Sequence, residues 1–235
     1  MPTRYLPVIR SNAELDISEM TPRVLRGKMT LREMLAYCQA HRIAGIATLF
    51  LEANADDLFA HLNMSGWAFA HFLKNAGDAN KATGFALPLF DAISTVDWEC
   101  ARNIAAYSRA TWNSQEEYED DFLHVRFLML HFFSNGTTAE SQCLLARYET
   151  VLSGSEDIRL LMDRALLAKD AAIFSEAFET FLANEKSRYA SLIGRDAIAQ
   201  EVAATEAKLS IEGLALARLA EKMGVVLQKN YALLP

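Results

Sequence analysis

The stretch Ser114–Phe133, SQEEYEDDFLHVRFLMLHFF, carries five acidic residues in its first half and is almost entirely apolar in its second half. A helix that is apolar nearly all round has no face suited to water, so we expect this one at the centre of the protein. Ser114 and Glu117 have the spacing of a capping box, which predicts that the helix begins there. Asn135 and Gly136 predict its end, because both residues readily take the left-handed backbone conformation that closes helices.

The rest of the sequence also indicates helices. The 235 residues include 10 glycines and 5 prolines, about half the share of roughly 12% in an average globular protein. So few turn residues predict long helices in place of many short strands. Capping residues and glycine stops place the further helices at residues 30–41, 54–75, 94–107, 138–152, 156–168, 171–192 and 196–223.

The predicted fold class is therefore all-α, a single domain of stacked antiparallel helical hairpins over residues 29–235, because short connections favour antiparallel neighbours. Residues 76–85 form the clearest loop. Residues 1–28 contain three prolines and Gly27, and we expect an N-terminal arm there, either extended or a short helix docked on the domain. Leu214–Gly224 is similar in texture to a tetratricopeptide helix, but the chain shows no fixed repeat period.

The composition of the chain indicates which classes of partner and which cellular compartment to expect. The formal net charge is −7 and no basic patch is visible, so we expect no nucleic-acid partner. Apolar stretches such as Ile43–Leu51 are too short to span a bilayer, and residues 1–10 lack the apolar run of a signal peptide. Cys38, Cys100 and Cys143 are odd in number and lie in apolar helical patterns, which predicts buried free thiols. These features predict a cytoplasmic protein without a membrane partner.

The sequence contains no glycine-rich phosphate loop, no GxSxG elbow and no HExxH motif. Only Asp121 and His124 approximate the Glu-x-x-His pair of a di-iron site, which needs two such pairs. His124 and His131 are seven residues apart, or about 10.5 Å along a helix, too far to share an ion ligated at about 2 Å. We therefore expect no catalytic residues, no cofactor and no metal. The tryptophans fall in helical patterns and are expected in the core: Trp67, Trp98 and Trp112.

The acidic run admits two interpretations. Acids near a helix N-terminus interact favourably with the helix dipole, but this effect fades within the first turn. The remaining acids either form a network inside the bundle or offer an acidic surface to a partner. We expect Asp121 to be structural, paired with His124 or Arg126. The predicted partner-binding residues, with Tyr118 as a possible anchor, are Glu116, Glu117, Tyr118, Glu119 and Asp120.

The run EYEDDF at Glu117–Phe122, followed by an apolar helix, resembles the all-α immunity proteins of bacterial polymorphic toxin systems, specifically the forty-ninth immunity-protein family. The segment EGLALARLAEKMG at Glu212–Gly224, followed by Tyr231 and Pro235, is similar to the segment that closes that family's domain. The similarity covers roughly the second half of the chain, and residues 1–90 show nothing comparable. The resemblance implies a non-enzymatic inhibitor that binds a cognate toxin domain, often one delivered by a type VI or related secretion system.

Two other functions stay open from the residues alone. A helical adaptor or regulatory protein would bind a peptide in a concave, partly apolar groove. An enzyme would use helix-borne acids such as Asp120 and Asp121 in a deep pocket that perturbs their pKa values.

Overall fold

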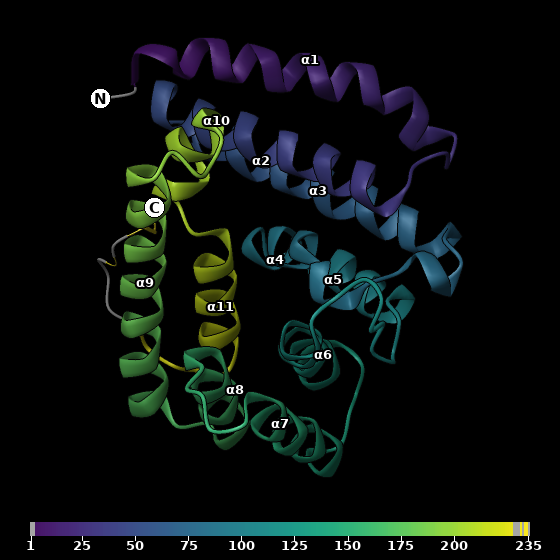
Figure 1. Ribbon diagram of the computed structural model, residues 1–235, viewed down its shortest axis with the longest axis vertical. Helices are drawn as coiled ribbons and strands as arrows, with labels where there is room; N and C mark the ends of the chain where they lie inside the picture. Colours follow the sequence, from purple (N-terminus) through teal and green to yellow (C-terminus); the bar gives the residue numbers. More distant parts are fainter. Residues whose placement is uncertain (1–2, 228–230, 232, 235) are drawn as a thin grey trace.

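The computed structural model describes residues 3–227, 231 and 233–234, and in that part of the chain it contains helices and no strand. Three long helices lie side by side at one end of the molecule, α6 lies near the middle, and α9 runs along one side back toward the first end (Figure 1). This arrangement confirms the predicted all-α domain. The α-helices are α1 (Leu6–Leu25), α2 (Leu31–Glu52), α3 (Ala55–Asn75), α4 (Leu87–Ser94), α5 (Trp98–Tyr107), α6 (Glu119–Phe133), α7 (Thr138–Leu152), α8 (Ile158–Ala168), α9 (Ala171–Gly194), α10 (Gln200–Ala204) and α11 (Ile211–Lys222). Short 3-10 turns are η1 (Thr3–Tyr5), η2 (Asp78–Asn80), η3 (Thr83–Phe85) and η4 (Glu206–Lys208).

Local capping sets the start of several helices where the sequence predicts it. Thr30 accepts the backbone N–H of Glu33, and the Glu33 carboxylate accepts the N–H of Thr30 in return, which completes a capping box. Asn54 caps α3 with its side chain alone, which accepts the backbone N–H groups of Asp56 and Asp57. α2 continues to Glu52, well beyond the predicted end near residue 41. Its second half is buried almost all round because α1, α3 and α4 pack against it.

The N-terminal segment differs from the predicted arm. It forms α1, a helix of 20 residues that runs antiparallel to α2. Leu6 packs with Ala47, and Ala13 packs with Ile43 nearer the start of α2. The prolines mislead here, because one lies in the first turn, where its missing N–H is not needed, and the other lies one turn from the helix end.

The chain segment 196–223, predicted as one helix, is broken into α10, η4 and α11. The Ser210 hydroxyl accepts the N–H of Gly213 and starts α11 anew. A side chain at Gly213 would place its Cβ 2.7 Å from Leu182 of α9, so the glycine permits close packing of these two helices. A second difference is α4, a helix that the sequence analysis did not assign.

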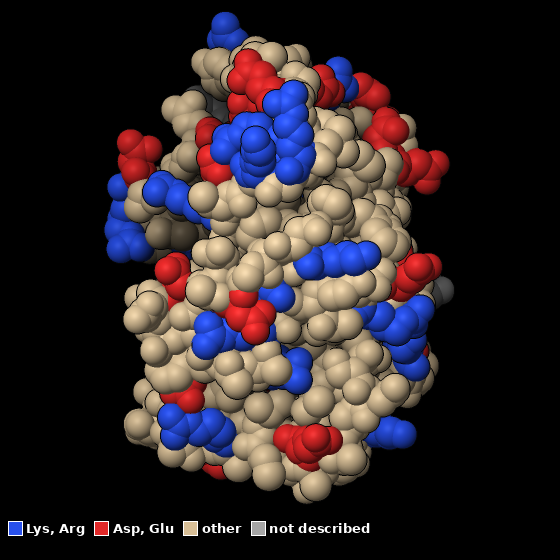
Figure 2. Space-filling view, turned by 90° about the vertical axis from the view of Figure 1, so that its right-hand side faces the viewer, with Lys and Arg blue, Asp and Glu red and all other residues tan. Residues whose placement is uncertain are grey.

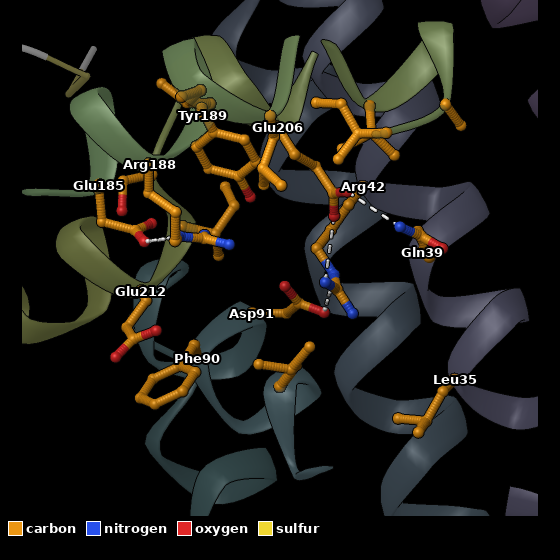
Figure 3. A pocket seen from close by; sticks show the side chains of 18 of the residues that line it. Leu35, Gln39, Arg42, Phe90, Asp91, Glu185, Arg188, Tyr189, Glu206 and Glu212 are labelled. Atoms are coloured by element: carbon orange, nitrogen blue, oxygen red, sulfur yellow. Dashed lines mark hydrogen bonds and ion pairs between the residues drawn. The ribbon is translucent and has the colours of Figure 1, made fainter. Parts of the chain in front are cut away.

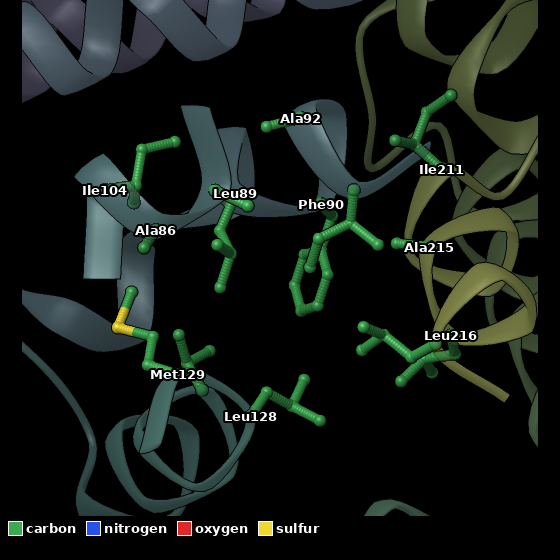
Figure 4. Close-up of a cluster of buried hydrophobic side chains, with 14 of the residues drawn as sticks. Ala86, Leu89, Phe90, Ala92, Ile104, Leu128, Met129, Ile211, Ala215 and Leu216 are labelled. Carbon is green, nitrogen blue, oxygen red and sulfur yellow. The ribbon is translucent and has the colours of Figure 1, made fainter. Parts of the chain in front are cut away.

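One apolar core joins the first and last parts of the chain. The second half of α6 is buried as expected, including Phe127, Leu128 and Met129. Figure 4 shows Leu128 and Met129 beneath the α4 residues Leu89 and Phe90, with Leu216 of α11 beside them. The C-terminal helix α11 therefore closes the same core that α4 and α6 begin.

Some residues expected in the core are exposed. Cys38 and Cys100 are buried free thiols as predicted, but Cys143 is exposed on α7. Trp67 and Trp112 are 42% and 38% exposed, contrary to the prediction, and the indole N–H of each donates to an oxygen nearby. In the described part of the chain, no helix combines the length and the apolar character needed to cross a membrane.

Candidate functional site

Two loops on one side of the molecule are joined by hydrogen bonds. The loop between α3 and α4 (residues 76–86) and the loop between α5 and α6 (residues 108–118) are called the paired loops below. The Thr83 hydroxyl donates to the carbonyl of Arg109 at 2.7 Å, and the Asn113 side-chain amide donates to the carbonyl of Lys81 at 3.1 Å. These contacts give two irregular segments a defined position on the helical body.

Glu117 is the central tie of the paired loops. Its side chain is only 7% exposed, and its carboxylate accepts the backbone N–H groups of Asn113, at 3.1 Å, and of Gly84. Burial raises the pKa of Glu117, although both backbone donors favour the charged form. A Cβ on Gly84 would lie 3.0 Å from this carboxylate and from the backbone nitrogen of Phe122, so the approach depends on a glycine.

The paired loops present aromatic side chains to solvent. Phe85 is 36% exposed, Trp112 is 38% exposed and Tyr118 is 76% exposed. The Trp112 indole N–H donates to the carbonyl of Glu117 at 3.0 Å, which links the loop's first part to its end. Exposed aromatic residues on a backbone fixed by hydrogen bonds are typical of protein-binding surfaces.

The molecule seen from the side of the paired loops shows uncharged residues over most of its middle, with both basic and acidic residues scattered among them (Figure 2). The predicted acidic surface is therefore broken up in this view. The reason is that several acids of the run are used inside the protein, as their contacts show.

The structure separates the five predicted partner-binding residues. Glu116 and Tyr118 are exposed, and Glu116 lines a hollow of about 440 Å³ beside the start of α2. Asp120 is half-buried at the start of α6. Glu119 accepts two hydrogen bonds from the Arg147 guanidinium, at 2.7 and 2.9 Å, and so ties α6 to α7. Glu117 lies inside, and the helix begins at Glu119 and not at the predicted Ser114–Glu117 capping box.

Asp121 is structural as expected, but its partner differs from the prediction. Its carboxylate accepts from the Arg159 guanidinium of α8 at 2.9 Å, whereas the prediction named His124 or Arg126. His124 instead lies 2.9 Å from Asp163, with both side chains fully enclosed. The predicted pairing is wrong because Asp121 and His124 each pair with a residue of α8 and not with each other.

The pair His124–Asp163 is charged at neutral pH. Burial alone lowers the pKa of His124, but the attraction of Asp163 and the nearby Glu212 outweighs it and raises this pKa to about 9. Burial raises the pKa of Asp163 to about 6. The described residues contain no group of three or more side chains that would hold a metal ion.

A cavity of about 650 Å³ lies between α2, α4, α9 and α11, with η4 at its edge (Figure 3). Its wall is apolar at Leu35, Phe90 and Ile211 and also contains three arginines and four acids. The sequence analysis missed this site, because its residues come from elements far apart in the chain. The charged side chains and the tyrosine that line it are Arg32, Arg42, Arg188, Tyr189, Asp91, Glu185, Glu206 and Glu212.

Arg42 holds two of these acids. Its guanidinium lies 3.2 Å from Asp91 and 3.2 Å from Glu206, and Gln39 donates a further hydrogen bond to Glu206 at 3.0 Å. Asp91 also accepts from the Ser65 hydroxyl. Burial raises the pKa of Asp91 to about 6, against the opposing effects of Arg42 and Ser65.

The second arginine in the cavity is also paired. Arg188 donates to Glu185 at 2.8 Å, and its guanidinium lies 4.3 Å from the centre of the Tyr189 ring. Asp120 and Asp121, the acids considered for an enzyme, do not line this cavity. Arg42 and Arg188 are paired with neighbouring carboxylates, which makes the inner wall of the cavity suited to binding through its remaining carboxylate oxygens.

Comparisons with protein-family models, curated proteins and solved structures found no match for this chain.

Proposed function

We propose that this protein is an immunity protein, a non-enzymatic inhibitor that binds a cognate toxin domain in the cytoplasm of the bacterium that makes the toxin. The paired loops are the proposed contact surface. The observation that carries the proposal is the exposure of Phe85, Trp112 and Tyr118 on a backbone that Glu117 holds in place.

Such a surface suits tight and selective binding. Aromatic side chains supply much of the energy of protein interfaces when a partner covers them. The hydrogen bonds of Glu117 fix the loops before a partner arrives, so less conformational entropy is lost on association. Glu116 and Asp120 lie beside Tyr118 in sequence, and a net charge of −7 favours approach to a basic partner.

The resemblance to the forty-ninth immunity-protein family supports a toxin as the partner. In the run EYEDDF, Tyr118 is exposed, whereas Glu117, Glu119 and Asp121 attach the loop and α6 to other elements. The segment Glu212–Gly224 contributes α11 to the core. On this interpretation the two similar segments build the framework, and Tyr118 is the exposed part of that framework.

The proposal is tested with the toxin gene expected next to the gene of this protein. That gene should encode a large protein whose C-terminal domain is the toxin. Cells that express this toxin domain should die or stop growing, and co-expression of this chain should restore growth. Binding of the two purified proteins is then measured by calorimetry. Tyr118→Ala and Trp112→Ala should each weaken binding by tenfold or more, since truncation of a buried aromatic anchor costs about 2 kcal/mol or more.

Trp67→Ala is the matched control. Trp67 has a similar exposed fraction and a similar indole hydrogen bond, but it lies on α3, outside the paired loops. It should bind within twofold of the wild-type protein. A wild-type chain that neither binds the toxin domain nor restores growth would refute the immunity function, and equal losses for Trp67→Ala and Trp112→Ala would remove the paired loops from the interface.

A further inference from the structure

The geometry points to a binding site for an organic cation, a primary ammonium or guanidinium group on an aliphatic stem, in the cavity between α2, α4, α9 and α11. Asp91 is its proposed anchor. The inference does not depend on the proposed function, because it uses a different part of the molecule.

Asp91 has one carboxylate oxygen without a partner. The side chain is 0% exposed. Its two polar neighbours, the Ser65 hydroxyl that donates a hydrogen bond and the Arg42 guanidinium that forms an ion pair, both meet the same oxygen, Oδ2. No group in the described part of the protein donates to Oδ1, which is itself shielded from solvent. Figure 3 shows this second oxygen turned away from Arg42, on the side of the cavity. A buried carboxylate oxygen without a donor is unfavourable, and a ligand N–H would satisfy it.

The charge balance of the wall favours a cation. Four carboxylates line the cavity against three arginines. Arg42 is shared between Asp91 and Glu206, and Arg188 is held by Glu185. Arg32 lies on the exposed side of α2. An anion at the inner wall would meet Arg42 and Arg188, which are already paired with carboxylates, whereas a cation finds carboxylate oxygens to accept its protons.

Glu212 supplies a second carboxylate to the cavity. Its Oε1 forms an ion pair with Nε2 of His124 at 3.6 Å, a distance too long for a hydrogen bond. The side chain keeps 24% of its surface exposed, so it is accessible to a ligand in the cavity. Asp91 from α4 and Glu212 from α11 thus contribute negative charge from two different walls.

The remaining wall suits an aliphatic stem. Phe90 and the Tyr189 ring lie on different sides of the cavity, as Figure 3 shows, and Leu209 and Ile211 extend the apolar lining. A volume of about 650 Å³ is within the usual range of roughly 300–1,000 Å³ for small-molecule sites. A ligand with an apolar stem and a charged end is either a free small amine or guanidine, or a lysine or arginine side chain of another protein.

The test is calorimetric titration at physiological salt with three probes: butylguanidinium, the uncharged butylurea of the same shape, and a blocked tripeptide with a central arginine. Butylguanidinium should bind in a 1:1 ratio, and butylurea at least tenfold more weakly. Binding of butylguanidinium alone would identify a free small cation as the ligand. Binding of the peptide as well would identify a side chain of a partner. No saturable binding by either cation, or equal binding of butylurea, would overturn the inference.

Variants assign the site. Asp91→Asn should weaken butylguanidinium binding at least tenfold and Glu212→Gln at least threefold. Glu221→Gln removes one charge from the same helix as Glu212, at an exposed position paired with Arg218, and should bind within 1.5-fold of the wild-type protein. Since Asp91→Asn disturbs a buried ion pair, its fold is checked by circular dichroism, and Glu212→Gln carries the test if it unfolds. Equal weakening by Glu212→Gln and Glu221→Gln would show general charge attraction and refute the site.

Discussion

Replacement of Glu117 by alanine tests most directly whether this carboxylate holds the paired loops in position. The structure assigns this residue to the interior, where its carboxylate accepts the N–H groups of Gly84 and Asn113. The substitution removes both bonds and leaves two backbone donors near a surface that water reaches only in part. A hydrogen bond to a charged group contributes about 1.5–3 kcal/mol, and partial access of water to the freed donors reduces the loss. We expect the free energy of unfolding to fall by about 2–4 kcal/mol.

The assay combines urea unfolding with hydrogen exchange. Glu117→Ala should lower the urea midpoint and speed exchange in residues 76–86 and 108–118 more than in α6. Glu116→Gln, a change at the exposed neighbouring acid, should alter the free energy of unfolding by less than about 0.5 kcal/mol. A Glu117→Ala protein with unchanged stability and unchanged loop exchange would show that the carboxylate does not hold the loops and would return it to the exposed partner surface.

Three further predictions concern buried groups. Asp163→Asn should lower the free energy of unfolding by about 3–5 kcal/mol, measured in urea at pH 7, because it removes the nearer and fully buried carboxylate of the two beside the imidazolium of His124. A loss below about 1 kcal/mol would contradict a charged pair. The pKa of His124 in the folded protein is raised to about 9. The contribution of the charged His124 to stability is therefore complete below about pH 6.5 and is lost as the pH rises through about 9. The melting temperature should accordingly fall between about pH 7 and pH 10 in the wild-type protein and much less in His124→Gln. Among the thiols, Cys143 should react quickly with a disulfide reagent in the native protein, whereas burial raises the pKa of Cys38 to about 12 and also raises that of Cys100; three fast thiols would refute the packing of α2 and α5.

The sequence predicts helices best where local contacts decide them. The Thr30–Glu33 capping box and the Asn54 cap both form between residues at most three positions apart, so no other part of the chain is needed. The same reasoning fails at Ser114–Glu117. There the glutamate has the right spacing, but the backbone N–H of Gly84, from a distant loop, takes its carboxylate. The spacing of a capping box shows only that a local backbone donor is available to the glutamate. Tertiary structure determines which donor its carboxylate actually accepts.

The sequence predicts some of the exposed residues of the candidate site but not others. Tyr118 and Glu116 stand in a run of acids that the helix dipole does not fully explain, and both are exposed. Trp112 was predicted in the core, since an aromatic residue in an apolar pattern normally lies there. Phe85 lies at the end of the predicted loop 76–85 and was not singled out. Their exposure depends on the hydrogen bonds between the paired loops. These bonds join residues about 30 positions apart in the sequence, such as Glu117 and Gly84, which are 33 positions apart.

Asp91 and Asp163 share a sequence signal, because each is an acid inside a largely apolar helical run, LPLFDAIS and LLMDRALL. Such an acid must be buried and therefore paired, but its partner, Arg42 or His124, lies on another helix and cannot be read from the run. Among the residues that the structure describes, neither Oδ1 has a hydrogen-bond partner. Space separates their roles, because Asp91 lines the cavity of about 650 Å³ and Asp163 does not. The same signal thus marks a structural ion pair in packed surroundings and a ligand site where the wall opens, and a cation that binds Asp91 has no equivalent route to Asp163.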